Sequence, residues 1–134
     1  MFSVEVQDSP VIAVRSARHE VSYAVNGTLM NPLEAFYATL AGCAAVYAKK
    51  ACAELGISAE GIHIASKPFA GAGGPLTLAR FRTEVTFPAR FTASQRDAVL
   101  ASIAHCAVKE IVAGGQTVEF SVTEKQSVAD TAPV

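Results

Sequence analysis

Apolar and polar residues alternate in three short runs over the first 25 residues of the chain. A period of two with many β-branched residues is typical of half-buried strands. Turn-forming stretches at 8–10 and 16–18 separate the runs, and Asn26-Gly27 closes the third. We therefore predict an antiparallel meander whose apolar positions are Phe2, Val4, Val6, Ile12, Val14, Val21, Tyr23 and Val25.

The pattern changes at residue 31, where an alanine-rich stretch begins that carries no charge over 35–48. Asn31 is suited to the N-cap and Pro32 to the first helical position, and Glu34 is placed to complete a capping box. Gly56 is suited to end the helix. A helix of this length, about 36 Å, spans a small domain, so we expect it to run through the middle. Its uncharged stretch is shorter than the roughly 20 residues that a membrane-spanning helix needs.

The second half of the chain predicts a hairpin, a helix and a last strand. A strand at 62–66 is followed by the glycine-rich loop 70–75 and by a clearly alternating strand at 81–87. Thr92 is placed to cap a helix over roughly 93–113. Alternating valine and phenylalanine at 118–122 predict the final strand. This order of elements indicates an α+β fold, with the helices packed against antiparallel sheet.

Composition places the chain among globular proteins, since 51% of its 134 residues are hydrophobic and 17% are charged. We expect a single domain over 1–125 and a frayed tail over 126–134. A formal net charge of -1 provides no basic stripe, so we expect no nucleic acid partner. The first residues have neither a basic start nor an apolar core typical of a secretion signal. We therefore expect a cytoplasmic protein that does not enter a membrane.

The chain has three cysteines, and their spacing matches no zinc-binding pattern. Cys43 and Cys52 lie nine residues apart, on opposite faces of the predicted helix, so they cannot bond to each other. Cys106 lies on the second predicted helix, where it can face the first. If any pair forms a disulfide, it is Cys43 with Cys106. Each cysteine can also be an inert, buried apolar side chain, and we favour that interpretation for Cys52.

Two stretches resemble the OsmC/Ohr family of osmotically induced proteins and organic hydroperoxide resistance proteins. These are Pro32-x-Glu34 followed by Leu40-Ala41-Gly42-Cys43, and Cys106 on a later helix before the last strand. The resemblance covers roughly residues 11–123 and includes the order of elements. It implies antiparallel sheets packed around a long central helix and a second helix. It also implies an intertwined homodimer with two sites, each lined by both subunits.

The resemblance further implies a thiol-dependent peroxidase that reduces organic hydroperoxides. Cys43 would then be the peroxidatic cysteine and Cys106 the resolving cysteine. A dithiol would reduce the disulfide that results. Thiol chemistry of this kind requires no metal and no organic cofactor.

Two positions depart from the family pattern. Leu33 occupies the position of a glutamate that helps to activate the thiolate, and Ala107 replaces a proline that often follows the second cysteine. Glu34 is the neighbouring carboxylate and remains a candidate catalytic residue, although it also suits a capping box. Arg18 is the candidate for the activating cation. Arg15 is the other basic residue of the same region, and we favour a solvated turn charge for it.

Three hypotheses follow. The first is a hydroperoxide reductase that uses Cys43 and Cys106. The second is a protein of the same fold without peroxidase activity, which binds a small apolar or thiol-bearing molecule between its subunits; the missing glutamate motivates it. In the third, both cysteines only pack. Thiol reactivity separates them, because only the first requires a fast, low-pKa thiol.

Overall fold

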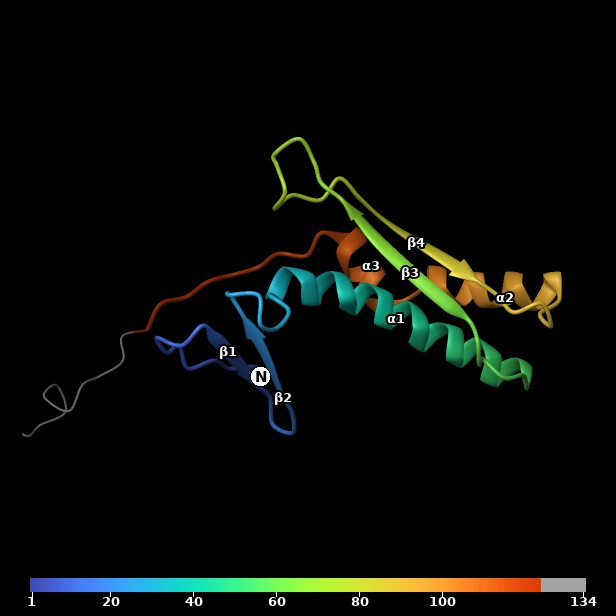
Figure 1. Cartoon of the computed structure of the whole chain (residues 1–134), viewed down its shortest axis with the longest axis horizontal. Coiled ribbons are helices and arrows are strands. Elements are labelled where there is room, and N and C mark those ends of the chain that lie inside the picture. Colours follow the sequence, from blue (N-terminus) through green and yellow to red (C-terminus); the bar gives the residue numbers. More distant parts are fainter. Residues whose placement is uncertain (124–134) are drawn as a thin grey trace, which may run out of the picture.

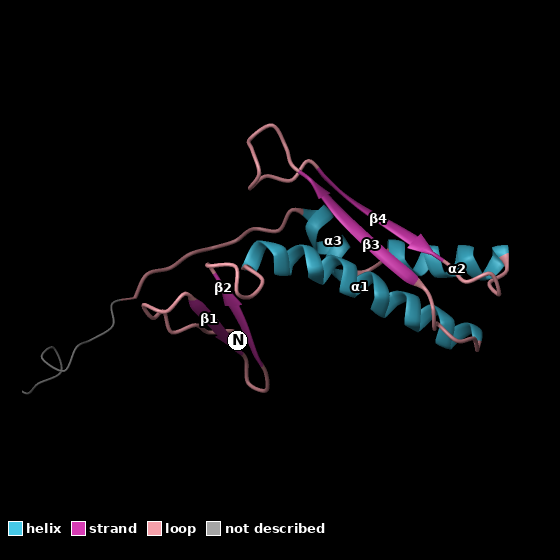
Figure 2. Ribbon diagram, in the orientation of Figure 1, coloured by secondary structure: helices cyan, strands magenta, loops and turns pink. Residues whose placement is uncertain are grey.

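Residues 1–123 form two antiparallel hairpins and three helices (Figures 1 and 2). The structure is a computed structural model that describes residues 1–123. In chain order the elements are β1 Val11–Arg15, β2 Glu20–Ala24, α1 Pro32–Leu55, β3 His63–Phe69, β4 Arg80–Thr86, α2 Ala93–Ala104 and α3 Ala107–Gly114. The predicted α+β class is therefore confirmed.

Helix α1 begins and ends as its sequence predicts. The Asn31 side-chain oxygen accepts a hydrogen bond from the backbone N–H of Glu34 at 2.9 Å, and Pro32 occupies the first turn. The Glu34 carboxylate accepts a bond from the side-chain amide of Asn31, also at 2.9 Å. Gly56 ends the helix in the left-handed conformation, with φ 69°, which glycine adopts without steric cost.

Each hairpin is a two-stranded antiparallel sheet. In the first, Val11 pairs with Ala24 and Arg15 with Glu20. In the second, β3 pairs with β4 along its whole length, and the glycine-rich loop 70–79 connects them. The predicted meander is formed only in part. Within residues 1–7, Ser3 alone makes a β-bridge, and its partner is Arg15.

Helix α1 is the centre of the larger part of the molecule. Strand β3, helix α2 and helix α3 all pack against it, whereas the β1–β2 hairpin stands apart near its N-terminal end (Figure 1). The Ser102 hydroxyl of α2 donates a hydrogen bond to the Tyr47 carbonyl of α1 at 3.0 Å. Small residues along α1 permit this close packing. The buried cluster consists of Ala48, Ala51, Cys52, Phe91 and Val99.

Two predicted elements differ from the structure. The prediction of one second helix over 93–113 was wrong, because α2 ends at Ala104 and α3 begins at Ala107. The predicted last strand at 118–122 is also absent, since these residues pair with no strand among residues 1–123 and their apolar side chains are exposed. A strand needs a neighbour to satisfy its backbone groups. The expected frayed tail at 126–134 lies outside the described residues. Within the described part of the chain, no helix combines the length and apolarity needed to cross a bilayer.

Candidate functional site

The interruption between α2 and α3 places Cys106 at a helix start. Its backbone is extended, with φ −61° and ψ 137°, and its sulfur accepts a hydrogen bond from the backbone N–H of Lys109 at 3.3 Å. Cys106 is therefore the N-cap of α3, a role that oxygen-bearing side chains usually fill. Its sulfur lies at the positive end of the helix dipole.

Cys43 of α1 lies near enough to Cys106 to affect the titration of its thiol. Burial raises the pKa of the Cys106 thiol above its ordinary value of 9.0, and a hydrogen bond and a charge interaction with Cys43 raise this pKa further. The backbone N–H groups of Lys109 and Val108 act in the opposite direction and lower it. Both are free cysteines in the structure, where Cys43 is half-buried and Cys106 is 3% exposed. The structure thus brings together the two sulfurs that the sequence singled out.

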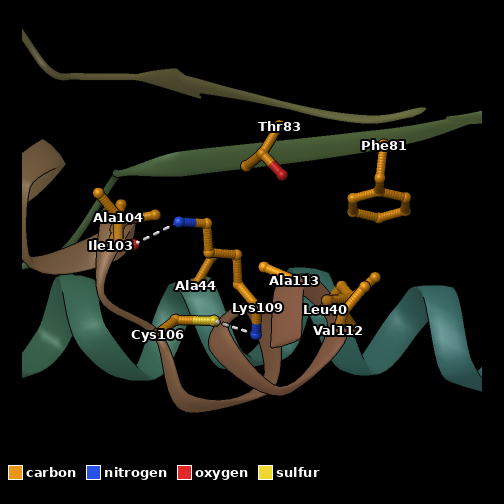
Figure 3. Close-up of a pocket in the computed structure, with 10 residues that line it drawn as sticks. All are labelled: Leu40, Ala44, Phe81, Thr83, Ile103, Ala104, Cys106, Lys109, Val112 and Ala113. Atoms are coloured by element: carbon orange, nitrogen blue, oxygen red, sulfur yellow. Dashed lines mark hydrogen bonds between the residues drawn. The ribbon is translucent and has the colours of Figure 1, made fainter. Parts of the chain in front are cut away.

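An apolar cavity of about 380 Å³ opens beside Cys106 (Figure 3). Helix α1 forms its floor, β4 covers it, and the end of α2 and helix α3 close its sides. Phe81 and Thr83 point from β4 toward the helices (Figure 3). A cavity with few polar groups on an apolar wall is typical of sites for small organic ligands. Its lining residues are Leu40, Ala44, Phe81, Thr83, Ile103, Ala104, Cys106, Lys109, Val112 and Ala113.

Lys109 brings a positive charge to this cavity. Its ammonium group donates a hydrogen bond to the carbonyl of Ala104 at 3.1 Å, which satisfies an end carbonyl of α2. The same ammonium lies 3.7 Å from a carboxylate oxygen of Glu110, and Nδ1 of His105 lies 3.8 Å from the same oxygen. Because these side chains are more than half exposed, the ion pairs add little stability.

The other candidate residues lie elsewhere in the chain. Arg18 is exposed in the turn between β1 and β2 and does not line the cavity. Glu34 lies in the first turn of α1, where Asn31 binds its carboxylate. Cys52 is 1% exposed within the apolar cluster, which agrees with the inert role expected for it. Within one chain, therefore, neither Arg18 nor Glu34 joins the two cysteines.

Lys109 and the two β4 residues of the cavity were not anticipated from the sequence. For Lys109 a signal existed, because it lies three positions after Cys106, where the first turn of a capped helix donates its N–H. Cysteine is a rare cap, so the pattern was not recognised. For Phe81 and Thr83 the alternation predicted only that they share one face of the strand.

The described residues contain no group of three or more histidine, cysteine or acidic side chains that could hold a metal ion. What residues 1–123 provide at this place is two neighbouring thiols and an apolar cavity beside Cys106.

Comparison with known proteins gives one family and a consistent fold. The OsmC family model, which describes an OsmC-like protein, matches residues 25–121. Among solved structures, an OsmC-like protein from Mycoplasma pneumoniae has a TM-score of 0.69 at 10% identity, covering 86% of this chain and 87% of that one. A second, from Psychrobacter arcticus 273-4, is described as an osmotic stress induced and detoxification response protein. It has a TM-score of 0.68 at 14% identity and covers 81% and 85% of the two chains. No curated protein matches the sequence.

Proposed function

This chain belongs to the OsmC-like protein family, and on that premise we propose that it is a thiol-dependent reductase of organic hydroperoxides in the oxidative stress response. Cys43 is the peroxidatic cysteine and Cys106 the resolving cysteine. The observation that carries the proposal is the nearness of the two thiols on α1 and at the start of α3, which is close enough for Cys43 to raise the pKa of Cys106. The apolar cavity that Cys106 lines supports an organic substrate rather than hydrogen peroxide.

The reaction needs only sulfur chemistry. The Cys43 thiolate attacks the outer oxygen of the hydroperoxide, the O–O bond breaks, and the alkoxide leaves and takes a proton to become an alcohol. Cys43 is now a sulfenic acid. The Cys106 thiol then attacks that sulfur, water leaves, and a Cys43–Cys106 disulfide forms. A dithiol reductant exchanges with this disulfide and returns both cysteines to thiols.

The assignment of Cys43 as the attacking sulfur follows from exposure and protonation. Cys106 is almost fully buried and its pKa is raised, chiefly by burial, so it holds its proton near neutral pH. Cys43 is the more exposed of the two. A thiol that stays protonated is a poor nucleophile toward peroxide. In the second step Cys106 attacks as the thiolate, and its proton leaves with the hydroxyl of the sulfenic acid as water.

Activation of Cys43 requires a second copy of the chain in this proposal. Leu33 provides no carboxylate, and Arg18 and Glu34 do not reach the cysteines of their own chain. In a dimer whose sites are lined by both subunits, Arg18 is the cation and Glu34 the carboxylate that can be supplied from the partner. Lys109 is the cation that the chain itself places at the cavity.

Exposed apolar surface supports the dimer. On α1 the uncharged stretch 35–48 exposes Phe36, Gly42 and Val46, and Val46 is 60% exposed; Lys49 and Lys50 follow it. On the C-terminal segment, Phe120 is 91% exposed although its neighbours alternate as in a strand. Large apolar side chains exposed on a single chain are surface that a second subunit can cover.

Turnover measures the proposed activity. Cumene hydroperoxide with dihydrolipoamide as the reductant should be consumed by the full chain, and Cys43→Ser should abolish consumption. The matched control is Cys52→Ala, which removes the buried third thiol and should retain turnover. Peroxide without reductant should lower the mass of the chain by two hydrogens, mapped to Cys43 and Cys106. Turnover that survives Cys43→Ser would refute the mechanism, and inert thiols would leave an apolar binding protein.

A further inference from the structure

The outer face of the β3–β4 hairpin carries a group of basic side chains. Strand β4 alternates, so Phe81 and Thr83 face the cysteine cavity while Arg80 and Arg82 lie on the opposite face. Across the ladder, Lys67 pairs with Arg82 and Phe69 pairs with Arg80. Three basic residues and one aromatic ring thus occupy neighbouring positions. We call these four residues, Lys67, Phe69, Arg80 and Arg82, the cationic face.

The ring of Phe69 holds two of these cations in place. The guanidinium carbon of Arg80 lies 4.2 Å from the ring centroid, and the ammonium nitrogen of Lys67 lies 5.4 Å from it. Both distances are within the range of cation–π attraction. A stacked guanidinium has already lost much of its rotational freedom, so it gives up less entropy when it binds an anion.

The charges of this face are only partly balanced. Arg82 pairs with the carboxylate of Glu84, its neighbour on the same strand. Lys67 and Arg80 have no carboxylate partner among residues 1–123. Lys67 also stands directly opposite Arg82, and like charges at such positions destabilise a sheet. This local excess of positive charge occurs in a chain whose formal net charge is -1.

A surface hollow lies over the same residues. It has a volume of about 340 Å³ and is lined by Lys67, Phe69 and Arg82 together with Ala65, Ser66 and Glu84. An anionic group that enters the hollow meets Lys67, which has no carboxylate partner among residues 1–123, and Arg82, which is paired with Glu84, and it relieves the repulsion between the two cations. We propose that the cationic face docks a carboxylate-rich segment of a partner protein.

Charge distribution favours an acidic polypeptide over two other polyanions. Nucleic acid binding draws on a basic stripe that follows many phosphates, and here the basic residues are confined to two strands. An anionic bilayer adds about 1 kcal/mol for each basic residue near it and usually requires an apolar anchor as well. On the nearby loop 70–79, Leu76 is the one exposed apolar side chain of large size, which is little anchorage for a bilayer. A short acidic segment needs only the few fixed cations that this face provides.

Fluorescence anisotropy of the full chain with a labelled peptide tests the proposal. The probe is a peptide in which glutamate alternates with glycine, and the same peptide with glutamine is its control. The acidic probe should bind, the glutamine probe should not, and rising salt should weaken the binding. Arg80→Gln and Lys67→Gln should each weaken it by about fivefold or more. Arg96→Gln, which removes an exposed arginine of α2, should leave it unchanged.

Phe69→Leu separates an organised site from a mere sum of charges. It keeps every charge but removes the ring beneath Arg80, and it should weaken binding of the acidic probe by about threefold or more. Circular dichroism shows whether each variant is folded. Equal binding by wild type, Arg80→Gln and Lys67→Gln overturns the proposal. So does tighter binding of oligothymidylate, or of phosphatidylserine vesicles, through the same residues. Because none of these measurements involves peroxide, their outcome is independent of the proposed reductase activity.

Discussion

The sulfur of Cys106 accepts a hydrogen bond from the backbone N–H of Lys109, with 3.3 Å between the two atoms. One side chain is therefore both the N-cap of α3 and a partner of Cys43. Helix α3 has no buried residue of its own, so it depends on this cap more than a well-packed helix would. The state of the thiol and the order of the cavity wall are thus linked.

Substitutions of Cys106 separate its capping role from its redox role. Cys106→Ala removes the acceptor and should increase amide exchange of Lys109 by about fivefold, equivalent to about 1 kcal/mol of local stability. Cys106→Ser keeps an acceptor that suits a helix cap, so exchange should stay near that of the wild type while disulfide formation is lost. Nuclear magnetic resonance of the amides measures the exchange rate in the wild type and in both variants. Equal exchange in all three proteins would show that the sulfur does not stabilise α3.

The pKa of Cys106 should depend on Cys43. Burial is the main cause of the raised pKa and remains in any Cys43 variant, whereas the hydrogen bond and charge interaction with Cys43 disappear in Cys43→Ala. Cys106 should then titrate at a lower pH in Cys43→Ala than in the wild type. The rate of its alkylation against pH, mapped by peptide mass spectrometry, reports the midpoint. A midpoint that moves upward would contradict the interaction between the two thiols.

The same shift predicts how stability varies with pH. Because the folded-state pKa of Cys106 is raised, folding favours the protonated thiol. This contribution is fully present below the ordinary pKa of 9.0 and is lost as pH rises through the folded-state value. Urea unfolding should show a larger loss of stability in alkaline buffer for the wild type than for Cys106→Ser. Parallel losses in the two proteins would assign the effect to other groups.

The core prediction concerns neighbouring residues of α2. Val99 is 0% exposed within the apolar cluster, whereas Leu100 is 44% exposed. Val99→Ala removes two buried methyl groups and leaves a cavity, and it should lower the free energy of unfolding by about 2 kcal/mol. Leu100→Ala removes more atoms yet should cost less than about 1 kcal/mol. Urea denaturation measures the free energy of unfolding of both variants. A larger loss for Leu100→Ala than for Val99→Ala would show that the buried face of α2 is wrongly assigned.

The sequence predicted local structure better than it predicted the site. Helix α1 was predicted at both ends because Asn31, Pro32 and Gly56 act through their own backbone neighbours. The interruption at Cys106 was missed because neither proline nor glycine marks it, and a sulfur cap depends on where the chain must turn to pack. The strand expected around Phe120 requires a partner that no residue of 1–123 supplies. Local signals therefore fix single elements, whereas the cavity depends on long-range packing.

The last prediction concerns the dimer that the proposed site requires. Val46 lies within the uncharged stretch 35–48 of α1 and is 60% exposed in one chain, so a charge there would be nearly neutral in a monomer. If a second copy covers Val46, Val46→Glu places a carboxylate in the interface, and the dimer should dissociate in light scattering after size exclusion. Leu76→Glu is the matched control, because Leu76 is a more exposed residue on the β3–β4 loop, and it should leave the mass unchanged. A Val46→Glu protein that remains dimeric would place the interface elsewhere. Loss of peroxide turnover together with the dimer would show that each site needs both chains.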